Sequence, residues 1–168
     1  MQYISRSLEK VVAQVTQEYP VVLVTGPRQV GKTTMLQKLM EGTDRSYVTL
    51  DDLNERSLAK TDPELFLQLH KPPVLIDEVQ YAPELFTYIK IHVDKTHAPG
   101  DFWLTGSQAF KLMRGVQESL AGRVAVLSMT SLSQTKTSST RWNPRRKHPN
   151  RQGSQQQEEI WNCHLFYL

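Results

Sequence analysis

Residues 26–33, GPRQVGKT, have the residue types and spacing that most clearly suggest chemistry. The spacing is that of a phosphate-binding loop, G-x-x-x-x-G-K-[ST], and the loop stands between an apolar run and a helical pattern. The glycines would let backbone N–H groups approach phosphate oxygens, and the start of the following helix adds about half a positive charge. We expect Lys32 beside the β and γ phosphates and the Thr33 hydroxyl as one ligand of Mg²⁺. A glycine turn with a surface lysine is the alternative.

Two adjacent carboxylates, Asp77 and Glu78, follow the apolar run 74–76. Like charges this close are costly to desolvate, and a divalent cation relieves that cost. If the run is a strand of a parallel sheet, its C-terminal end lies on the same side as the phosphate loop. We expect Asp77 to help hold Mg²⁺ through its water ligands and Glu78 to orient and polarise an attacking water. A solvated turn that begins at these two acids is the alternative.

Four further side chains are candidates for contact with a phosphate. Ser107 and Gln108 lie in the segment 105–108 after the apolar run 102–104, where a short hydroxyl or amide could reach a γ-phosphate. Equally, Ser107 could cap a helix or Thr105 could form a hydrogen bond within the turn. Arg123 precedes the last apolar run and could stabilise transition-state charge in its own subunit or in a neighbouring one. An arginine near a helix end is more commonly a cap or a surface ion pair. Arg28, inside the loop, could touch phosphate or a partner.

Apolar runs alternate with amphipathic segments through the first 130 residues. Strands are expected at residues 21–24, 47–50, 74–76, 102–104 and 124–127, and helices at residues 7–18, 32–40, 54–60, 63–70 and 83–95. Apolar runs without polar alternation are typical of strands buried on both faces in parallel sheets. We therefore expect an α/β fold with a doubly wound parallel sheet.

The net charge of +3 is unevenly distributed along the chain. Residues 1–130 hold 14 Lys and Arg against 15 Asp and Glu, whereas residues 131–168 hold 6 against 2. Within residues 131–157 only Leu132 and Trp142 are apolar, too few to offset the entropy of ordering the segment. We expect one domain over residues 1–130 and a basic, polar, disordered tail over residues 131–168. The cations and Trp142 within residues 141–148 could bind nucleic acid, and solvated disorder without a partner is the alternative.

Other classes of protein are excluded by composition. The single cysteine, Cys163, cannot form a disulfide within the chain. No run approaches the ~18 apolar residues of a membrane span, and residues 1–12 lack the pattern of a signal peptide. We therefore expect a cytoplasmic protein with no membrane partner.

Five segments together resemble a known family: GPRQVGKTT, LDDLNERSLAKTDPELFL, VLIDEVQYAPELF, FWLTGSQAFKLM and ESLAGRVAVL. In this order and spacing they resemble the AAA-type ATPase domain of a large prokaryotic family of ATP-binding proteins, over about residues 1–132. The resemblance implies a P-loop NTPase fold with about five strands in the order 5-1-4-3-2. In this order an additional strand, residues 102–104, lies between the strand before the phosphate loop and the strand before Asp77 and Glu78. It also implies ATP and Mg²⁺ as ligands and hydrolysis of ATP.

The resemblance also implies roles for particular residues. It identifies Walker A with Gly26, Gly31, Lys32 and Thr33, Walker B with Asp77 and Glu78, the sensor position with Ser107 and Gln108, and a Gly-Arg near the end of the core with Arg123. The expected nucleotide-binding set is Gly26, Pro27, Arg28, Gln29, Val30, Gly31, Lys32, Thr33 and Thr34, with Thr33 and Asp77 on the metal. If Arg123 acts across a subunit interface, the resemblance also implies a homo-oligomer.

Full-length members of that family join the ATPase domain to a C-terminal domain with nuclease-like or winged-helix features. Near Leu132 this chain departs from the family's leucine-rich continuation, so we expect a truncated or frame-shifted member that has lost any nucleic-acid partner of that domain. Three alternatives to an ATPase stay open: a nucleotide-binding switch without turnover, an inactive fragment and a P-loop kinase. The adjacent Asp77 and Glu78 argue against the kinase.

Overall fold

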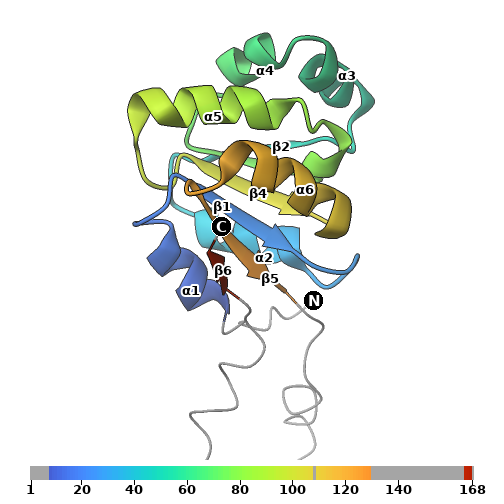
Figure 1. The fold of residues 1–168 in the computed structure, drawn as a ribbon. Coiled ribbons are helices and arrows are strands. Elements are labelled where there is room, and N and C mark those ends of the chain that lie inside the picture. The colour runs from blue at the N-terminus through green and yellow to red at the C-terminus, as the bar shows by residue number, and fades with distance from the viewer. Residues whose placement is uncertain (1–7, 108, 130–164, 168) are drawn as a thin grey trace, which may run out of the picture.

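A single six-stranded sheet with helices on both faces forms the centre of the molecule (Figure 1). The computed structural model describes residues 8–107, 109–129 and 165–167. The strands are β1 Val21–Thr25, β2 Ser46–Thr49, β3 Val74–Asp77, β4 Phe102–Gly106, β5 Val124–Ser128 and β6 Leu165–Tyr167. Their order is β2-β3-β4-β1-β5-β6, with the first five parallel and β6 antiparallel to β5. The expected doubly wound sheet and the order 5-1-4-3-2, read from its other end, are confirmed.

The helices form a layer on each face of the sheet. They are α1 Leu8–Val15, α2 Lys32–Met40, α3 Leu53–Thr61, α4 Pro63–Leu69, the 3₁₀ turn η1 Val79–Tyr81, α5 Leu85–Thr96 and α6 Ala109–Leu120. Helices α1 and α2 cover one face, and α3 to α6 lie on the other (Figure 1). The side chains of Asp52 and Asp62 cap the N-termini of α3 and α4. Asp52 accepts a hydrogen bond from the N–H of Glu55 at 3.2 Å, and Asp62 accepts one from the N–H of Leu65 at 2.9 Å.

The central strand β1 shows why its sequence has no polar alternation. All five of its residues are buried, and its four apolar residues divide between two apolar clusters on opposite faces of the sheet. Val21 and Leu23 pack with the cluster under α3 to α6, whereas Val22 and Val24 pack with the cluster under α1 and α2. A strand covered on both faces needs apolar residues at odd and even positions alike.

Three elements are additions to the pattern predicted from sequence: α6, η1 and β6. Helix α6 joins β4 to β5, as a parallel crossover requires, and packs closely on α5. A Cβ at Gly115 would lie 3.0 Å from ring carbons of Phe86, so glycine permits this approach. Strand β6 belongs to the segment expected to be a disordered tail. The rest of that segment, residues 131–164 and 168, lies outside the described residues, as do the basic positions within it.

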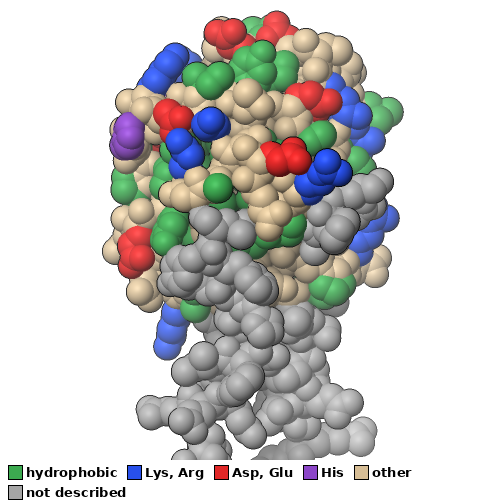
Figure 2. Space-filling model, viewed as in Figure 1, with side chains coloured by type: hydrophobic (Ala, Val, Ile, Leu, Met, Phe, Trp, Pro, Cys, Tyr) green, Lys and Arg blue, Asp and Glu red, His purple; other side chains and the backbone are tan. Residues whose placement is uncertain are grey.

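Charges of both signs are interspersed over the face drawn in Figure 2. This mixture agrees with the near balance of acidic and basic residues along residues 1–130. Within the described ranges, no helix combines the length and the apolar character that crossing a membrane would require.

Candidate nucleotide-binding site

Three motifs meet at one side of the sheet, where β1, β3 and β4 end, which we call the carboxyl edge. Strand β4 pairs with both β1 and β3, and Leu104 is in register with Leu23 on one side and Ile76 on the other. Because the three strands are parallel neighbours, their C-terminal ends lie together. The loop of residues 26–31, the acids at Asp77 and Glu78, and Ser107 are therefore brought to one place.

The phosphate loop takes its shape from three left-handed residues. Gly26 has φ 147°, Gln29 φ 62° and Gly31 φ 89°. A Cβ at Gly26 would lie 2.1 Å from the carbonyl oxygen of Met129, so the requirement for glycine there comes from the segment that follows β5. Gly31 is the N-cap of α2 and makes no side-chain cap, which leaves the first N–H groups of α2 for an anion.

Lys32 is the buried cation of this site. Its Nζ donates to the carbonyl oxygens of Gly26 at 3.0 Å and Pro27 at 2.7 Å, so the ammonium lies within the loop. Burial lowers the pKa of Lys32, while the negative charges of Glu78 and Asp77 act in the opposite direction. A desolvated ammonium facing two carboxylates is well placed for an anionic ligand.

Asp77 is held by hydroxyl groups from three different elements. Its Oδ1 accepts from Thr33 Oγ1 at 2.8 Å and from Thr105 Oγ1, and its Oδ2 accepts from the Tyr47 hydroxyl at 3.3 Å. Burial and the charge of Asp77 raise the pKa of Tyr47, which therefore remains a donor at neutral pH. A hydroxyl that donates to a carboxylate keeps its lone pairs, so Thr33 and Asp77 together offer the hard oxygen ligands that Mg²⁺ prefers.

Glu78 directly follows β3 in a left-handed conformation, with φ 58° and ψ 43°. Its N–H donates to Thr105 Oγ1 at 3.1 Å, which ties this turn to the neighbouring strand. Its carboxylate oxygen Oε2 accepts from Ser107 Oγ at 3.2 Å and from Gln80 Nε2. The structure therefore brings Ser107 to Glu78, whereas Gln108 lies outside the described residues.

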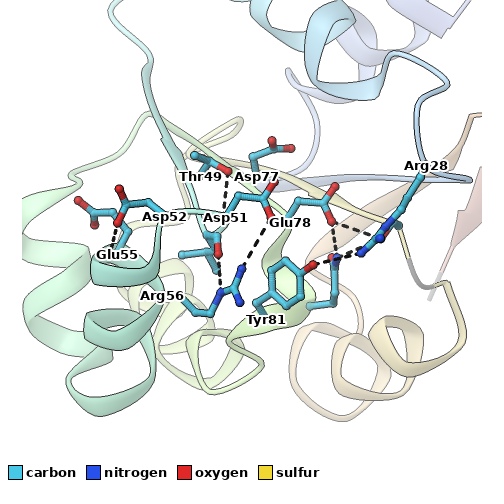
Figure 3. Close-up of polar contacts among 12 residues, drawn as sticks. Arg28, Thr49, Asp51, Asp52, Glu55, Arg56, Asp77, Glu78 and Tyr81 are labelled. Carbon is cyan, nitrogen blue, oxygen red and sulfur yellow. Dashed lines mark hydrogen bonds and ion pairs between the residues drawn. The ribbon is translucent and has the colours of Figure 1, made fainter.

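Arg28 leaves the loop and contacts η1 (Figure 3). Its Nη2 donates to the hydroxyl of Tyr81 at 3.1 Å, and the guanidinium of Arg56 lies 3.9 Å from the centre of the same ring. Arg56 is fixed in turn by the carbonyl of Leu50, which accepts from its Nε at 2.7 Å. The side chain of Arg28 thus joins the phosphate loop to η1, and the Tyr81 ring in turn contacts Arg56 of α3.

Arg123 lies at the opposite side of the sheet, where β1 and β5 begin, which we call the amino edge. Val124 is in register with Val21, and the N–H of Val21 donates to the carbonyl of Arg123. The five residues of β1 separate this position from the loop by about 16 Å. The Arg123 guanidinium binds Asp94, with Nη2 to Oδ2 at 3.2 Å, and the carbonyl of Ala121 at 2.9 Å. The expectation that Arg123 reaches a phosphate of its own subunit is not supported, because a strand's two ends lie at opposite edges.

Three contributors to the site were not predicted: Tyr47, Gln80 and Thr105. Thr105 offers a signal in the sequence, since a hydroxyl at the end of the buried strand 102–106 needs a partner. Tyr47 reaches Asp77 because β2 and β3 are neighbours, and Gln80 reaches Glu78 because the chain turns at Glu78. Neither relation is visible in residue spacing.

Comparison with known proteins agrees with this geometry. The profile of the family described as AAA domain matches residues 18–137. The uncharacterized protein Rv2008c of Mycobacterium tuberculosis and the uncharacterized protein Mb2031c of Mycobacterium bovis are each 37% identical over 115 residues. The match covers 68% of this chain and 26% of each relative, so the chain spans about a quarter of the length of the curated relatives it matches.

Solved structures share the fold at low sequence identity. A point variant of RuvB from Thermotoga maritima aligns with a TM-score of 0.53 and 16% identity, covering 77% of this chain and 46% of that chain. A Walker-type ATPase of Pyrococcus abyssi aligns with a TM-score of 0.51 and 17% identity, covering 76% of this chain and 54% of that chain. The likeness concerns the arrangement of the sheet and its helices.

Proposed function

Since the chain belongs to the AAA domain family, we propose that it binds ATP together with Mg²⁺ and hydrolyses the γ-phosphate. The observation that carries the proposal is the meeting of Lys32, Thr33, Asp77 and Glu78 at the carboxyl edge. In particular, the 2.8 Å contact between Thr33 and Asp77 joins the phosphate loop to the acids after β3.

The triphosphate is held by the loop and by the start of α2. Backbone N–H groups of residues 28–31 and the first turn of α2 would donate to its oxygens, with Lys32 beside the β and γ phosphates. The burial that lowers the pKa of Lys32 also strengthens the attraction between its ammonium and a bound anion.

Thr33 and Asp77 would hold the metal, directly and through its water ligands. When bound, Mg²⁺ would neutralise negative charge that develops on the phosphate oxygens during hydrolysis. Tyr47 and Thr105 fix Asp77 from its other sides, so its orientation does not depend on the ligand.

Glu78 would orient the attacking water. Water oxygen forms a bond to the γ-phosphorus, the bond from that phosphorus to the β,γ-bridging oxygen breaks, and ADP leaves with that oxygen. Glu78 accepts the hydrogen bond of the water and receives its proton, which then passes to the released phosphate. Ser107, whose Oγ donates to Glu78 Oε2 at 3.2 Å, would help to hold the carboxylate that orients this water.

The test is phosphate release from ATP by the whole chain with and without Mg²⁺, together with equilibrium binding of ATP. Lys32→Ala should lower both affinity and turnover, turnover by about 100-fold or more, whereas Glu78→Gln should lower kcat by about 100-fold and keep affinity. Lys38→Ala and Glu64→Gln serve as controls, because both side chains are exposed and away from the carboxyl edge. Turnover that survives Glu78→Gln, or a parent chain that does not bind ATP, would contradict the proposal.

A further inference from the structure

Beside the phosphate loop, Glu78, Gln80 and Ser107 form a closed ring of hydrogen bonds. Gln80 Nε2 donates to Glu78 Oε2 and to Ser107 Oγ at 3.1 Å, and Ser107 Oγ donates to the same Oε2 at 3.2 Å. The ring joins the residue after β3, the turn η1 and the end of β4. Gln80 has no contact with the phosphate loop among its described hydrogen bonds.

The orientation of the Gln80 amide is fixed by its two acceptors. A reversed amide would turn Oε1 toward the carboxylate of Glu78 and lose the donated hydrogen bonds. In the observed orientation Oε1 is buried and has no hydrogen-bond partner among the described residues. An unsatisfied buried oxygen lowers the stability of the fold, so the ring keeps this arrangement at the expense of stability.

The backbone around the ring is also unusual. Glu78 is a non-glycine residue in the left-handed region, a strained conformation that is concentrated at functional sites. The turn that follows it brings Gln80 back toward the Glu78 carboxylate. Gly106 makes room for the amide, since a Cβ there would lie 3.0 Å from Gln80 Oε1 and 2.4 Å from Leu112 Cδ2.

We propose that Gln80 is a positioning residue for Glu78. Gln80 and Ser107 both hold Oε2, which fixes the carboxylate and leaves Oε1 to accept the hydrogen bond of the attacking water. This inference rests on the proposed function, because it gives Gln80 a role only through Glu78. It assigns no contact between Gln80 and the nucleotide.

The effect of losing this support should fall on turnover and not on binding. A base displaced by about 1 Å can cost on the order of 100-fold in rate, and Ser107 retains part of the support. We expect Gln80→Met, which keeps the length of the side chain and removes its donor, to lower kcat about 10- to 50-fold. The affinity for ATP should stay within about twofold of the parent.

The experiment measures ATP affinity, kcat and melting temperature for the whole chain and its variants. Gln80→Met and Gln80→Leu both remove the amide donor without adding a charge, so either one suffices if the other does not fold. Gln68→Met is the matched control, because Gln68 is exposed on α4. The same Gln80 substitution is also placed in a Glu78→Gln background and followed under single-turnover conditions.

A positioning role through Glu78 predicts a fall in kcat for Gln80→Met alone and no further fall in the Glu78→Gln background. A folded Gln80 variant whose kcat stays within about twofold of the parent, or a fall of equal size in both backgrounds, overturns the inference. Turnover of the parent that is insensitive to Glu78→Gln overturns the proposed function, and the role of Gln80 with it. The two failures are therefore distinguishable.

Discussion

Acidic side chains at the two edges of the parallel sheet have different kinds of partner. At the amino edge two acids contact basic side chains, Asp94 with Arg123 and Asp101 with His92. At the carboxyl edge Asp77 and Glu78 are held by hydroxyl and amide donors, and no ion pair within the described ranges includes either of them. The charges of Asp94 and Asp101 are neutralised within the protein, whereas those of Asp77 and Glu78 are left for a ligand.

The buried Lys32 and the partly buried Arg45 differ in a related way. Arg45, at the amino edge, lies 4.0 Å from the centre of the Trp103 ring and donates to the carbonyl of Gly100 at 2.7 Å. Burial lowers the pKa of Arg45 to about 10, so it remains charged at neutral pH. Among the described residues, Lys32 donates to the carbonyls of Gly26 and Pro27 in its own loop and faces the carboxylates of Asp77 and Glu78 across the site. Arg45 thus ties strands together, whereas Lys32 is placed for a ligand.

The largest effect expected from this comparison follows one substitution at the carboxyl edge. Asp77→Asn removes the negative charge and nearly preserves the shape of the side chain, so Mg²⁺-dependent turnover should fall by about 100-fold or more. The melting temperature should change little, because the lost carboxylate had no cation partner. Phosphate release as a function of Mg²⁺ concentration, with thermal melting alongside, measures both. A large loss of stability with retained turnover would show that Asp77 supports the fold and not Mg²⁺-dependent hydrolysis.

A smaller effect, on stability alone, should follow Arg45→Met at the amino edge. Loss of the charged hydrogen bonds and of the stacking on Trp103 should cost about 2 kcal/mol, which lowers the melting temperature by about 4–8 °C. ATP affinity should be unchanged, and Arg45→Lys should restore only part of the stability because it lacks the planar fork. Reduced ATP affinity in a folded Arg45→Met variant would contradict the prediction that the amino edge affects stability alone.

The smallest effect is expected for Asp94→Asn, the same substitution at the opposite edge. The hydrogen bond from Arg123 lowers the pKa of Asp94 below its ordinary 3.8, so the ionised form favours the fold. This contribution is complete above the ordinary pKa and is lost as pH falls through the lowered value. Melting curves of the parent and the variant should therefore differ slightly at pH 7 and converge in acid.

Arg123 itself provides the control for that prediction. Arg123→Met should match Asp94→Asn in stability and leave turnover unchanged at every protein concentration. A fall in turnover that appears only where the chain self-associates would instead place Arg123 at the site of a neighbouring subunit.

Much of the carboxyl edge could be predicted from sequence because its signals are local. The spacing of the loop and the position of Asp77 and Glu78 after an apolar run identify the ends of two strands, and parallel pairing brings such ends together. The same rule, applied to Arg123, would have placed it away from the loop, since it precedes its strand. The family motif suggested that Arg123 contacts a phosphate, but the direction of the parallel strands places Arg123 at the edge opposite the phosphate loop.

The parts that sequence did not predict depend on packing. Helix α6 contains Gly115, which lowers its helical propensity but lets it approach Phe86. The contact from Gln80 to Glu78 depends on a left-handed turn that nothing in the residue spacing indicates. The pairing of β6 with β5 joins segments far apart in the chain.

Thermal melting of the whole chain with and without ATP and Mg²⁺, beside Lys32→Met, tests the assignment of the carboxyl edge most directly. A ligand at about 100 times its Kd stabilises the folded state by about 2.7 kcal/mol, so the melting temperature of the parent should rise by about 5–10 °C. Lys32→Met should melt at or above the parent without ligand, because its buried amine is gone, and should show no rise with ATP and Mg²⁺. No rise for the parent, or the same rise for both proteins, would contradict the assignment.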